Sequence, residues 1–443
     1  MIRKRLIIFT RCPEAGKCKT RLIPLLGAEN TAELQRRMTA KMIGIGNEYI
    51  AKNRTDHLEV RYDGGSRELM VKTFSEADYQ PQPEGNLGLR MYKALEDAFM
   101  EGSELAVIIG SDCPDISMEL LENAFNHLQQ HDLVIGTAVD GGYYLIGMKR
   151  PISEVFLESI PWGTSSVLKK TLQITKKLNL SVHLLPRLAD VDLPQDIAGI
   201  YYNPLLDGIQ QPLISVVIPT LNEASFILQT IEAAKTNHVE IIVVDGGSTD
   251  ETRELAIKAG VKVIQSPRGR GRQLNEGALH AVGKIIIFLH ADTVLPKGFA
   301  AEVISALSKP KTIAGAFRLG ITGKNWALGM VSLFTNLRSI FFQLPYGDQA
   351  IFIYKEQFQR VGGFPDIPIM EDYALVLRLK KLGRIAISSK SVQTSGRRWD
   401  KLGYFRTLLI NQAMIIGYHV GIAIDRLERF YLRHKGEKPK IEI

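Results

Sequence analysis

Two apolar runs that end close to an aspartate constrain the fold of this chain more than any other feature. Residues 243–250 read VVDGGSTD and residues 288–293 read FLHADT, and each segment continues a β-branched stretch typical of a buried parallel strand. In open α/β sheets, ligands bind just beyond the carboxyl ends of the strands. Asp245 and Asp292 are therefore expected at such an edge, where carboxylates suit a nucleotide and a divalent metal ion.

The strand and helix pattern runs in two separate series. A chain of 443 residues is too long for one ordinary core, so two domains are expected. Alternating strands and helices indicate α/β domains with mostly parallel sheets. The pattern breaks in a short, proline-bounded segment and then restarts. We predict strands at 6–9, 106–109, 133–136 and 214–219, helices at 28–50 and 118–130, domains at 1–205 and 213–400, a linker at 206–212, and an apolar and basic helical segment at 401–443.

Composition narrows the functional class. Hydrophobic content of 45% and charged content of 23% are those of a folded globular protein. A net charge of +8 suits anionic substrates or an anionic membrane surface, and no basic block with interleaved aromatics indicates nucleic-acid binding. The three cysteines, Cys12, Cys18 and Cys113, are odd in number and lack paired short spacings, which disfavours both a disulfide framework and a zinc site and favours a reducing cytoplasm. The apolar run at 6–9 is too short for a signal peptide.

Further charged motifs follow in the second half. Glu371 and Asp372 form an acidic pair, which can act in proton transfer or simply favour a helix N-terminus. Arg397, Arg398 and Trp399 come after them, and arginines can stabilise negative charge. Alternatively, these three residues simply lie at a solvent-exposed edge of the fold.

In this order the motifs resemble the family 2 glycosyltransferases over about residues 213–400. The resemblance implies a GT-A fold and one direct displacement that inverts the anomeric carbon. It departs from the family where His290 replaces the first aspartate of Asp-x-Asp and where no glutamine opens the Arg-Trp element. The roles it implies are nucleotide-sugar binding by Pro219, Asn222, Glu223, Asp245, Gly246 and Trp399, Mg²⁺ or Mn²⁺ binding by Asp292 and His290, general base for Asp372 with Glu371 beside it, and leaving-group stabilisation by Arg397 and Arg398.

A basic loop follows the first predicted strand of the N-terminal half. It carries one glycine and four basic side chains, a combination that can hold phosphates, although its spacing is not that of a P-loop. These side chains are Arg11, Lys17, Lys19 and Arg21.

Residues 3–200 resemble nucleotidyltransferases of the molybdenum-cofactor guanylyltransferase and lactate-phosphate guanylyltransferase type. That resemblance implies a nucleoside triphosphate under the basic loop and a magnesium ion between Asp112 and Asp192, with Asp190 as the alternative to Asp192. The segment Asp140, Gly141 and Gly142 would bind an acceptor sugar or phosphate, or would merely form a tight turn.

The C-terminal region has a stretch of 18 residues without a formal charge, 407–424, followed by a basic flank. Three readings stay open, namely attachment at the membrane interface, a membrane span, and a buried packing or dimer helix.

We expect a cytoplasmic, bifunctional enzyme, with peripheral contact to the inner face of the cell membrane as an option. Its second half is expected to be a metal-dependent, inverting glycosyltransferase that uses a nucleoside-diphosphate sugar and a lipid-like or small-molecule acceptor. The alternatives are a nucleotidyltransferase whose second half only recruits acceptors, and a nucleotide-sugar-binding scaffold at the membrane.

Overall fold

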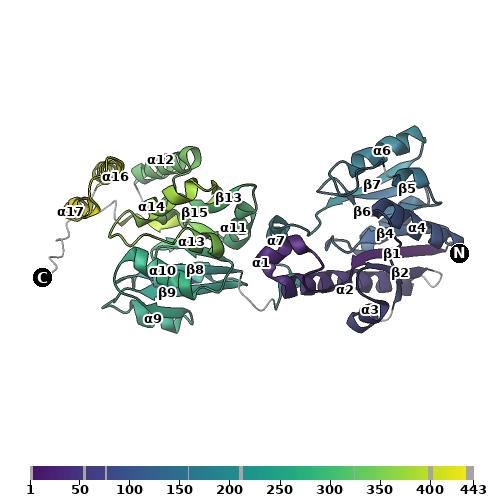
Figure 1. Ribbon diagram of the computed structural model, residues 1–443, viewed down its shortest axis with the longest axis horizontal. Coiled ribbons are helices and arrows are strands. Elements are labelled where there is room, and N and C mark those ends of the chain that lie inside the picture. Colours follow the sequence, from purple (N-terminus) through teal and green to yellow (C-terminus); the bar gives the residue numbers. More distant parts are fainter. Residues whose placement is uncertain are drawn as a thin grey trace. The chain divides into compact units, whose positions relative to one another are not determined.

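The computed structural model describes residues 3–52, 56–74, 77–157, 159–208, 213–323, 325–397 and 403–435. The chain forms two compact units, Met1–Asp207 and Gly208–Ile443, which we call unit 1 and unit 2. Figure 1 shows unit 1 in purple and blue and unit 2 in teal to yellow. The predicted fold class is confirmed, because each unit is built on a mostly parallel α/β sheet.

The sheet of unit 1 has seven strands in the order β3-β2-β1-β4-β6-β5-β7. All neighbouring strands are parallel except β6, which runs antiparallel to β4 and β5. The strands are β1 (Lys4–Arg11), β2 (His57–Asp63), β3 (Asp78–Pro81), β4 (Leu105–Gly110), β5 (Leu133–Ala138), β6 (Tyr143–Met148) and β7 (Val182–Leu188).

Both faces of this sheet are covered. Successive residues of a strand point to opposite faces, so Leu6 packs in a cluster with Tyr49 and Phe125 on one face, and Ile7 packs with Leu95 on the other. The helices are α1 (Ile23–Leu26), α2 (Ala28–Lys52), α3 (Arg67–Thr73), α4 (Leu87–Met100), α5 (Met118–Leu128), α6 (Val167–Lys177) and α7 (Pro194–Ile200), with 3₁₀ turns η1 (Thr20–Leu22), η2 (Ser153–Phe156) and η3 (Pro204–Leu206).

The sheet of unit 2 has eight strands in the order β10-β9-β8-β11-β14-β13-β15-β12. Its first four strands are parallel, so β8, β9 and β11 end at the same edge. The antiparallel pairs are β11 with β14, β14 with β13, and β15 with β12. The strands are β8 (Ile214–Thr220), β9 (Val239–Asp245), β10 (Lys262–Gln265), β11 (Ile285–Phe288), β12 (Thr293–Val294), β13 (Thr312–Thr322), β14 (Phe352–Tyr354) and β15 (Arg384–Ser395).

Helices of unit 2 cover this sheet and carry parts of the site. Leu274 and Leu375 pack in one core cluster with Val217 and Val244 of the central strands. The helices are α8 (Ile227–Ala234), α9 (Thr252–Lys258), α10 (Arg270–His280), α11 (Phe299–Leu307), α12 (Trp326–Phe342), α13 (Lys355–Arg360), α14 (Glu371–Lys380), α16 (Tyr404–His419) and α17 (Ile424–Lys435), with the 3₁₀ turn η4 (Gly347–Gln349).

The uncharged C-terminal stretch does not form one continuous helix. Helix α16 ends at His419, Gly421 adopts φ 79°, and α17 begins at Ile424. Ile410 and Met414 of α16 pack against Leu427 of α17, which buries part of the apolar stretch inside a helical hairpin. Across the described part of the chain, no helix is both long and apolar enough to cross a bilayer.

Candidate functional site

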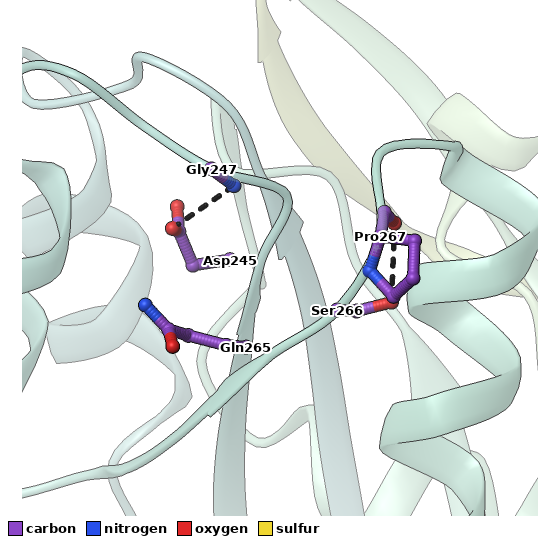
Figure 2. A pocket seen from close by; sticks show the side chains of 5 residues that line it. All are labelled: Asp245, Gly247, Gln265, Ser266 and Pro267. Atoms are coloured by element: carbon purple, nitrogen blue, oxygen red, sulfur yellow. Dashed lines mark hydrogen bonds between the residues drawn. The ribbon is translucent and has the colours of Figure 1, made fainter.

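Asp245 is the last residue of β9, and its carboxylate holds the turn that follows. It accepts hydrogen bonds from the backbone N–H groups of Gly247 and Ser248, each over 3.1 Å, and from Ser248 Oγ over 2.5 Å. The side chain is only 2% exposed. The turn borders a pocket of about 340 Å³, and Figure 2 shows the bond to Gly247 at its wall. Its lining residues are Asp245, Gly247, Gln265, Ser266 and Pro267.

The loop after β8 is tied to this turn. Asn222, at φ 56°, accepts the backbone N–H of Thr249 on its Oδ1 over 2.8 Å, and its own N–H donates to Ser248 Oγ over 2.9 Å. The next N–H, that of Glu223, donates to Thr252 Oγ1 over 2.8 Å. These bonds hold Glu223 at the carboxyl edge, beside the Asp245 turn.

A buried glutamine holds the carboxyl ends of β8 and β9 together. Gln273 of α10 donates to the carbonyls of Thr220 and Val244 over 2.9 and 2.8 Å. A β-carbon at Gly246 would lie 3.0 Å from the Gln273 amide, so the backbone there approaches α10 closely. Pro219 lies beside Val244 in the strand register and contributes to the same edge.

Arg397 joins two carboxylates from separate loops. Its Nη2 donates to Glu223 Oε1 over 2.6 Å and lies 3.1 Å from Asp292 Oδ2. The hydrogen bond to Glu223 and the charges of both carboxylates raise the pKa of the guanidinium above its ordinary value. Its Cζ also lies 4.7 Å from the ring centroid of Phe226. The arginine is therefore positively charged and fixed at the edge.

The oxygen atoms around Arg397 fit a hard divalent cation. Asp292 is 18% exposed, and the buried Glu223 Oε2 has no hydrogen-bond partner among the described residues. Mg²⁺ and Mn²⁺ take carboxylate oxygens of this kind. Glu223 was predicted to bind the nucleotide sugar, and its place beside Asp292 adds a second oxygen donor that the sequence alone did not indicate.

His290 and Asp292 lie near different residues of the site. It lines a small cavity together with Asp372, and its Nε2 would lie 3.1 Å from a β-carbon placed on Gly347. The loop after β11 thus directs one side chain toward Asp372 and another toward Arg397. The assignment of His290 as a metal ligand stays a prediction.

Asp372 is held from both sides at the start of α14. Its Oδ2 accepts the backbone N–H of Gly347 over 2.6 Å, and its Oδ1 accepts the N–H of Tyr373 over 2.7 Å. The cavity beside it is lined by Arg270, Leu274, Phe288, His290, Gly347, Ile351, Phe364, Glu371 and Asp372. Asp372 as a whole is partly buried.

Glu371 has a supporting position. It is 1% exposed and forms an ion pair with Arg270 Nε, so its charge is neutralised inside the protein. The preceding residue, Met370, adopts φ 68°, a left-handed conformation that is uncommon for a residue with a side chain. Met370 packs against the α16–α17 hairpin, and Tyr373 Oη lies 2.7 Å from His419 Nε2. The hairpin therefore braces the start of α14.

Two of the predicted site residues, Arg398 and Trp399, lie outside the described residues. Their predicted roles stay predictions.

In unit 1 the predicted basic loop divides into two parts. Lys19 Nζ lies 2.7 Å from Asp112 Oδ1 and 3.8 Å from Asp192 Oδ1, and Arg21 lies 3.1 Å from Asp192. Lys17 pairs with Glu14 instead, and Arg11 lies 3.6 Å from Asp63. Only Lys19 and Arg21 meet the predicted aspartates.

The Lys19 ammonium lies where the magnesium ion was predicted. Its side chain is 3% exposed and also donates to the carbonyl of Val191 over 2.6 Å, which fixes it between Asp112 and Asp192. Lys19 therefore pairs with both carboxylates, and the assignment of Asp112 and Asp192 as magnesium ligands stays a prediction. Asp190 is half-buried, and burial together with the nearby Asp140 raises its pKa.

The segment 140–142 forms the turn between β5 and β6. Asp140 Oδ1 accepts the N–H of Gly142 over 2.8 Å. Gly141 has φ 94°, and a β-carbon there would lie 2.3 Å from the Ser165 carbonyl oxygen, so only glycine fits. The geometry is that of the tight-turn alternative, and acceptor binding at this turn stays a prediction.

Three site residues were given no role from the sequence. Arg270 pairs with Glu371, Gln273 anchors the ends of β8 and β9, and Gly347 orients Asp372. Arg270 precedes Glu371 by 101 positions, and a single sequence carries no signal for such a pairing.

Comparison with known families gives two separate matches. Residues 48–164 match a family described as uncharacterized protein conserved in bacteria (DUF2064), and residues 215–364 match Glycosyl transferase family 2. The nucleotidyltransferase-like interpretation of unit 1 is thus not the description that its matching family carries.

Individual relatives give similar results. An "uncharacterized glycosyltransferase" of Mycobacterium tuberculosis is 29% identical over 114 residues, 26% of this chain and 52% of the relative, so the chain spans about half of that protein. A "putative nucleotide-diphospho-sugar transferase" structure from Desulfovibrio desulfuricans is 33% identical, with a TM-score of 0.42, and the match covers 47% of this chain and 90% of that one. A mannosyltransferase from Pyrobaculum calidifontis, solved with GDP-Man and Mn²⁺, is 22% identical over 50% of this chain and 73% of that one, with a TM-score of 0.36.

Proposed function

We propose that this chain, whose second unit contains a family 2 glycosyltransferase domain, transfers a sugar from a nucleoside-diphosphate sugar to an acceptor hydroxyl with inversion at the anomeric carbon. The observation that carries the proposal is the gathering of Asp245, of Glu223 with Asp292 and Arg397, and of Asp372 at the carboxyl ends of the parallel strands of one sheet. The nucleotide would then bind beside Asp245, the diphosphate beside Asp292 and Arg397, and the acceptor beside Asp372.

The nucleotide would occupy the pocket beside Asp245. The pocket volume, about 340 Å³, is in the range of small-ligand pockets. Asp245 offers carboxylate oxygens as acceptors for a base or ribose, and Pro267 offers an apolar surface for the base. The backbone turn at Gly247 permits close approach, because this residue has φ 93° and no side chain.

Asp292 and Glu223 would hold a divalent cation on the diphosphate. That cation would neutralise diphosphate charge, and Arg397 would add a fixed positive charge to the same group. As the leaving diphosphate gains negative charge in the transition state, a preorganised guanidinium stabilises it more than it stabilises the bound substrate.

Asp372 would act as the base. An acceptor hydroxyl is a weak nucleophile, so its proton passes to Asp372 as its oxygen bonds to the anomeric carbon. The bond from that carbon to the β-phosphate oxygen breaks in the same step, and the nucleoside diphosphate departs with the electron pair. The N–H groups of Gly347 and Tyr373 hold the carboxylate in place for this transfer.

We further propose a lipid-like acceptor at a membrane surface, on the evidence of α12. Its inner side is docked, with Asn336 bonded to the N–H and carbonyl of Leu319 over 2.7 and 2.9 Å. Its outer side leaves large apolar side chains exposed, which is unusual for a soluble surface. They are Trp326, Met330, Leu333, Phe334, Leu337, Ile340, Phe341 and Phe342, and we call them the α12 apolar face.

These observations favour a lipid bilayer as the partner that covers the α12 apolar face. The α12 apolar face is a helical stripe that begins with an exposed tryptophan, a residue enriched at membrane–water interfaces. The net charge of +8 complements anionic headgroups. Helix α12 is followed closely by Gly347, the residue that holds Asp372, so an acceptor in the bilayer surface would arrive near the proposed base.

A binding screen tests the donor. The full chain is titrated calorimetrically with uridine, guanosine, cytidine and thymidine diphosphate sugars, with Mn²⁺ and without it. The proposal expects one class of nucleotide to bind, more tightly with Mn²⁺, and Pro267→Asp to weaken that binding. Absence of binding by every nucleotide sugar would contradict it.

A further inference from the structure

Three histidines of unit 1 lie together at the end of α5 and on β7. His127 is in the last turn of α5, and His131 follows it by four positions. His183 is the second residue of β7, the edge strand of the sheet, where it lies opposite Val134 of β5. All three side chains are partly buried. We call them the histidine triad of unit 1.

The three rings are close enough to share one ligand. The ring centroids of His127 and His183 are 3.5 Å apart with an interplanar angle of 9°, and His131 lies 5.3 Å from His183. One nitrogen from each ring falls within 4.8 Å of the other two. A tetrahedral ion with metal–nitrogen distances of about 2.1 Å brings its ligand nitrogens to about 3.4 Å. An imidazole binds a metal in the plane of its ring, and the His127 and His183 rings are nearly parallel, so binding requires one of these two partly exposed rings to rotate out of the stack.

The hydrogen bonding prepares one ring for this role. His131 Nδ1 lies 3.0 Å from the backbone carbonyl oxygen of His127. A carbonyl oxygen only accepts, so Nδ1 of His131 carries the proton, and in the neutral ring Nε2 keeps its lone pair. Histidine ligands of metals usually donate their second ring N–H to a carbonyl or carboxylate in this way.

We propose that the histidine triad is a site for a divalent transition metal that prefers imidazole ligands, with Zn²⁺ as the reference ion. Zn²⁺ binds neutral imidazole nitrogens, and three protein ligands would leave its fourth position open to solvent. The ion would join the end of α5 to the edge strand β7. Among the described residues, this is the one place where three histidine, cysteine or carboxylate ligand atoms lie within that distance of each other.

The test uses the full chain with Mg²⁺ in excess, because Mg²⁺ occupies sites built from oxygen atoms and not sites built from imidazoles. Calorimetric titration with Zn²⁺ is expected to show one equivalent bound. His183→Ala should weaken that binding by at least about a hundredfold, since loss of even a group that orients a ligand costs about 10- to 100-fold. His57→Gln, which removes a half-exposed imidazole of unit 1 outside the triad, should leave it unchanged.

A second variant keeps the test decisive if His183→Ala folds poorly. His131→Gln changes a partly exposed side chain beyond the end of α5 and should cause the same loss of Zn²⁺ binding. Zn²⁺ should also raise the unfolding temperature of the parent chain and not that of His131→Gln. Absence of Zn²⁺ binding, or Zn²⁺ binding that His131→Gln leaves intact, would overturn the proposal.

Discussion

The backbone N–H of Gly347 donates a hydrogen bond of 2.6 Å to the carboxylate of Asp372, 25 positions along the chain. The bond joins the 3₁₀ turn η4 to the start of α14. A β-carbon on residue 347 would lie 3.0 Å from Asp372 Oδ2 and 3.1 Å from His290 Nε2. A glycine at this position therefore lets the turn approach the proposed base closely enough to fix its orientation.

Gly347→Ala tests this arrangement. The added methyl group must displace the Asp372 carboxylate or the His290 ring, because both lie at the limit of normal contact. A misplaced base lowers the rate of proton transfer, so we expect kcat to fall by at least about tenfold, in the range that general bases contribute. Steady-state kinetics measure it, and calorimetry should show unchanged nucleotide affinity. Gly329→Ala, whose β-carbon would meet open space, is the matched control; equal effects of both variants would contradict this prediction.

Arg397→Lys should slow sugar transfer without unfolding unit 2. Lysine keeps the positive charge but loses the planar group that reaches Glu223 and Asp292 together. We expect kcat to fall by about 10²- to 10³-fold, as for the removal of one preorganised group that stabilises developing charge. Arg272→Lys, at an exposed pair with Asp366, should keep normal kinetics. An Arg397→Lys enzyme with normal kcat would rule out a role at the diphosphate.

Removal of divalent metal should abolish sugar transfer. Treatment with EDTA is expected to bring product formation to background, and added Mn²⁺ or Mg²⁺ should restore it. Asp292→Asn should raise the metal concentration needed for half-maximal rate by at least about tenfold, because one carboxylate donor is lost. Activity that persists in EDTA would show that the carboxylates of Asp292 and Glu223 serve only to hold Arg397.

The α12 apolar face should bind anionic membranes. We expect the chain to sediment with vesicles that contain phosphatidylglycerol, and the double variant Phe334→Ser with Phe341→Ser to lose about 3 kcal/mol or more of binding free energy, at about 1.5–3 kcal/mol per buried phenylalanine. Both side chains are exposed, so the fold should be unaffected. Leu279→Ser, 71% exposed on α10, is the control. A face that instead mediates dimers would give concentration-dependent association in light scattering, and no vesicle binding.

Local patterns in the sequence were sufficient to predict the sheet edge. The apolar runs before Asp245 and Asp292 became β9 and β11, which lie on either side of β8 and end at the same edge of the sheet, as expected from α/β topology. The start of α14 at Glu371 was likewise expected from its acidic first turn. In each case the signal lies within about ten residues, the distance over which periodicity acts.

Long-range contacts were beyond that reach. The bond from Arg397 to Glu223 joins residues 174 positions apart, and the approach of Lys19 to Val191 spans 172. Which carboxylate a basic side chain meets depends on how loops pack, and no periodicity encodes it. For the same reason, the sequence could not show that the Lys19 ammonium would lie beside Asp112 and Asp192, where the magnesium ion was predicted.

The most direct measurement is the rate of sugar transfer by Asp372→Asn, with the accepted donor at saturation. The amide keeps the size of the side chain and the bond from Gly347 but cannot take up a proton, so we predict a fall in kcat of about 10²- to 10⁴-fold, with donor affinity unchanged. Asp366→Asn, an exposed aspartate of the same unit, should retain full activity. Full activity in Asp372→Asn would contradict the account.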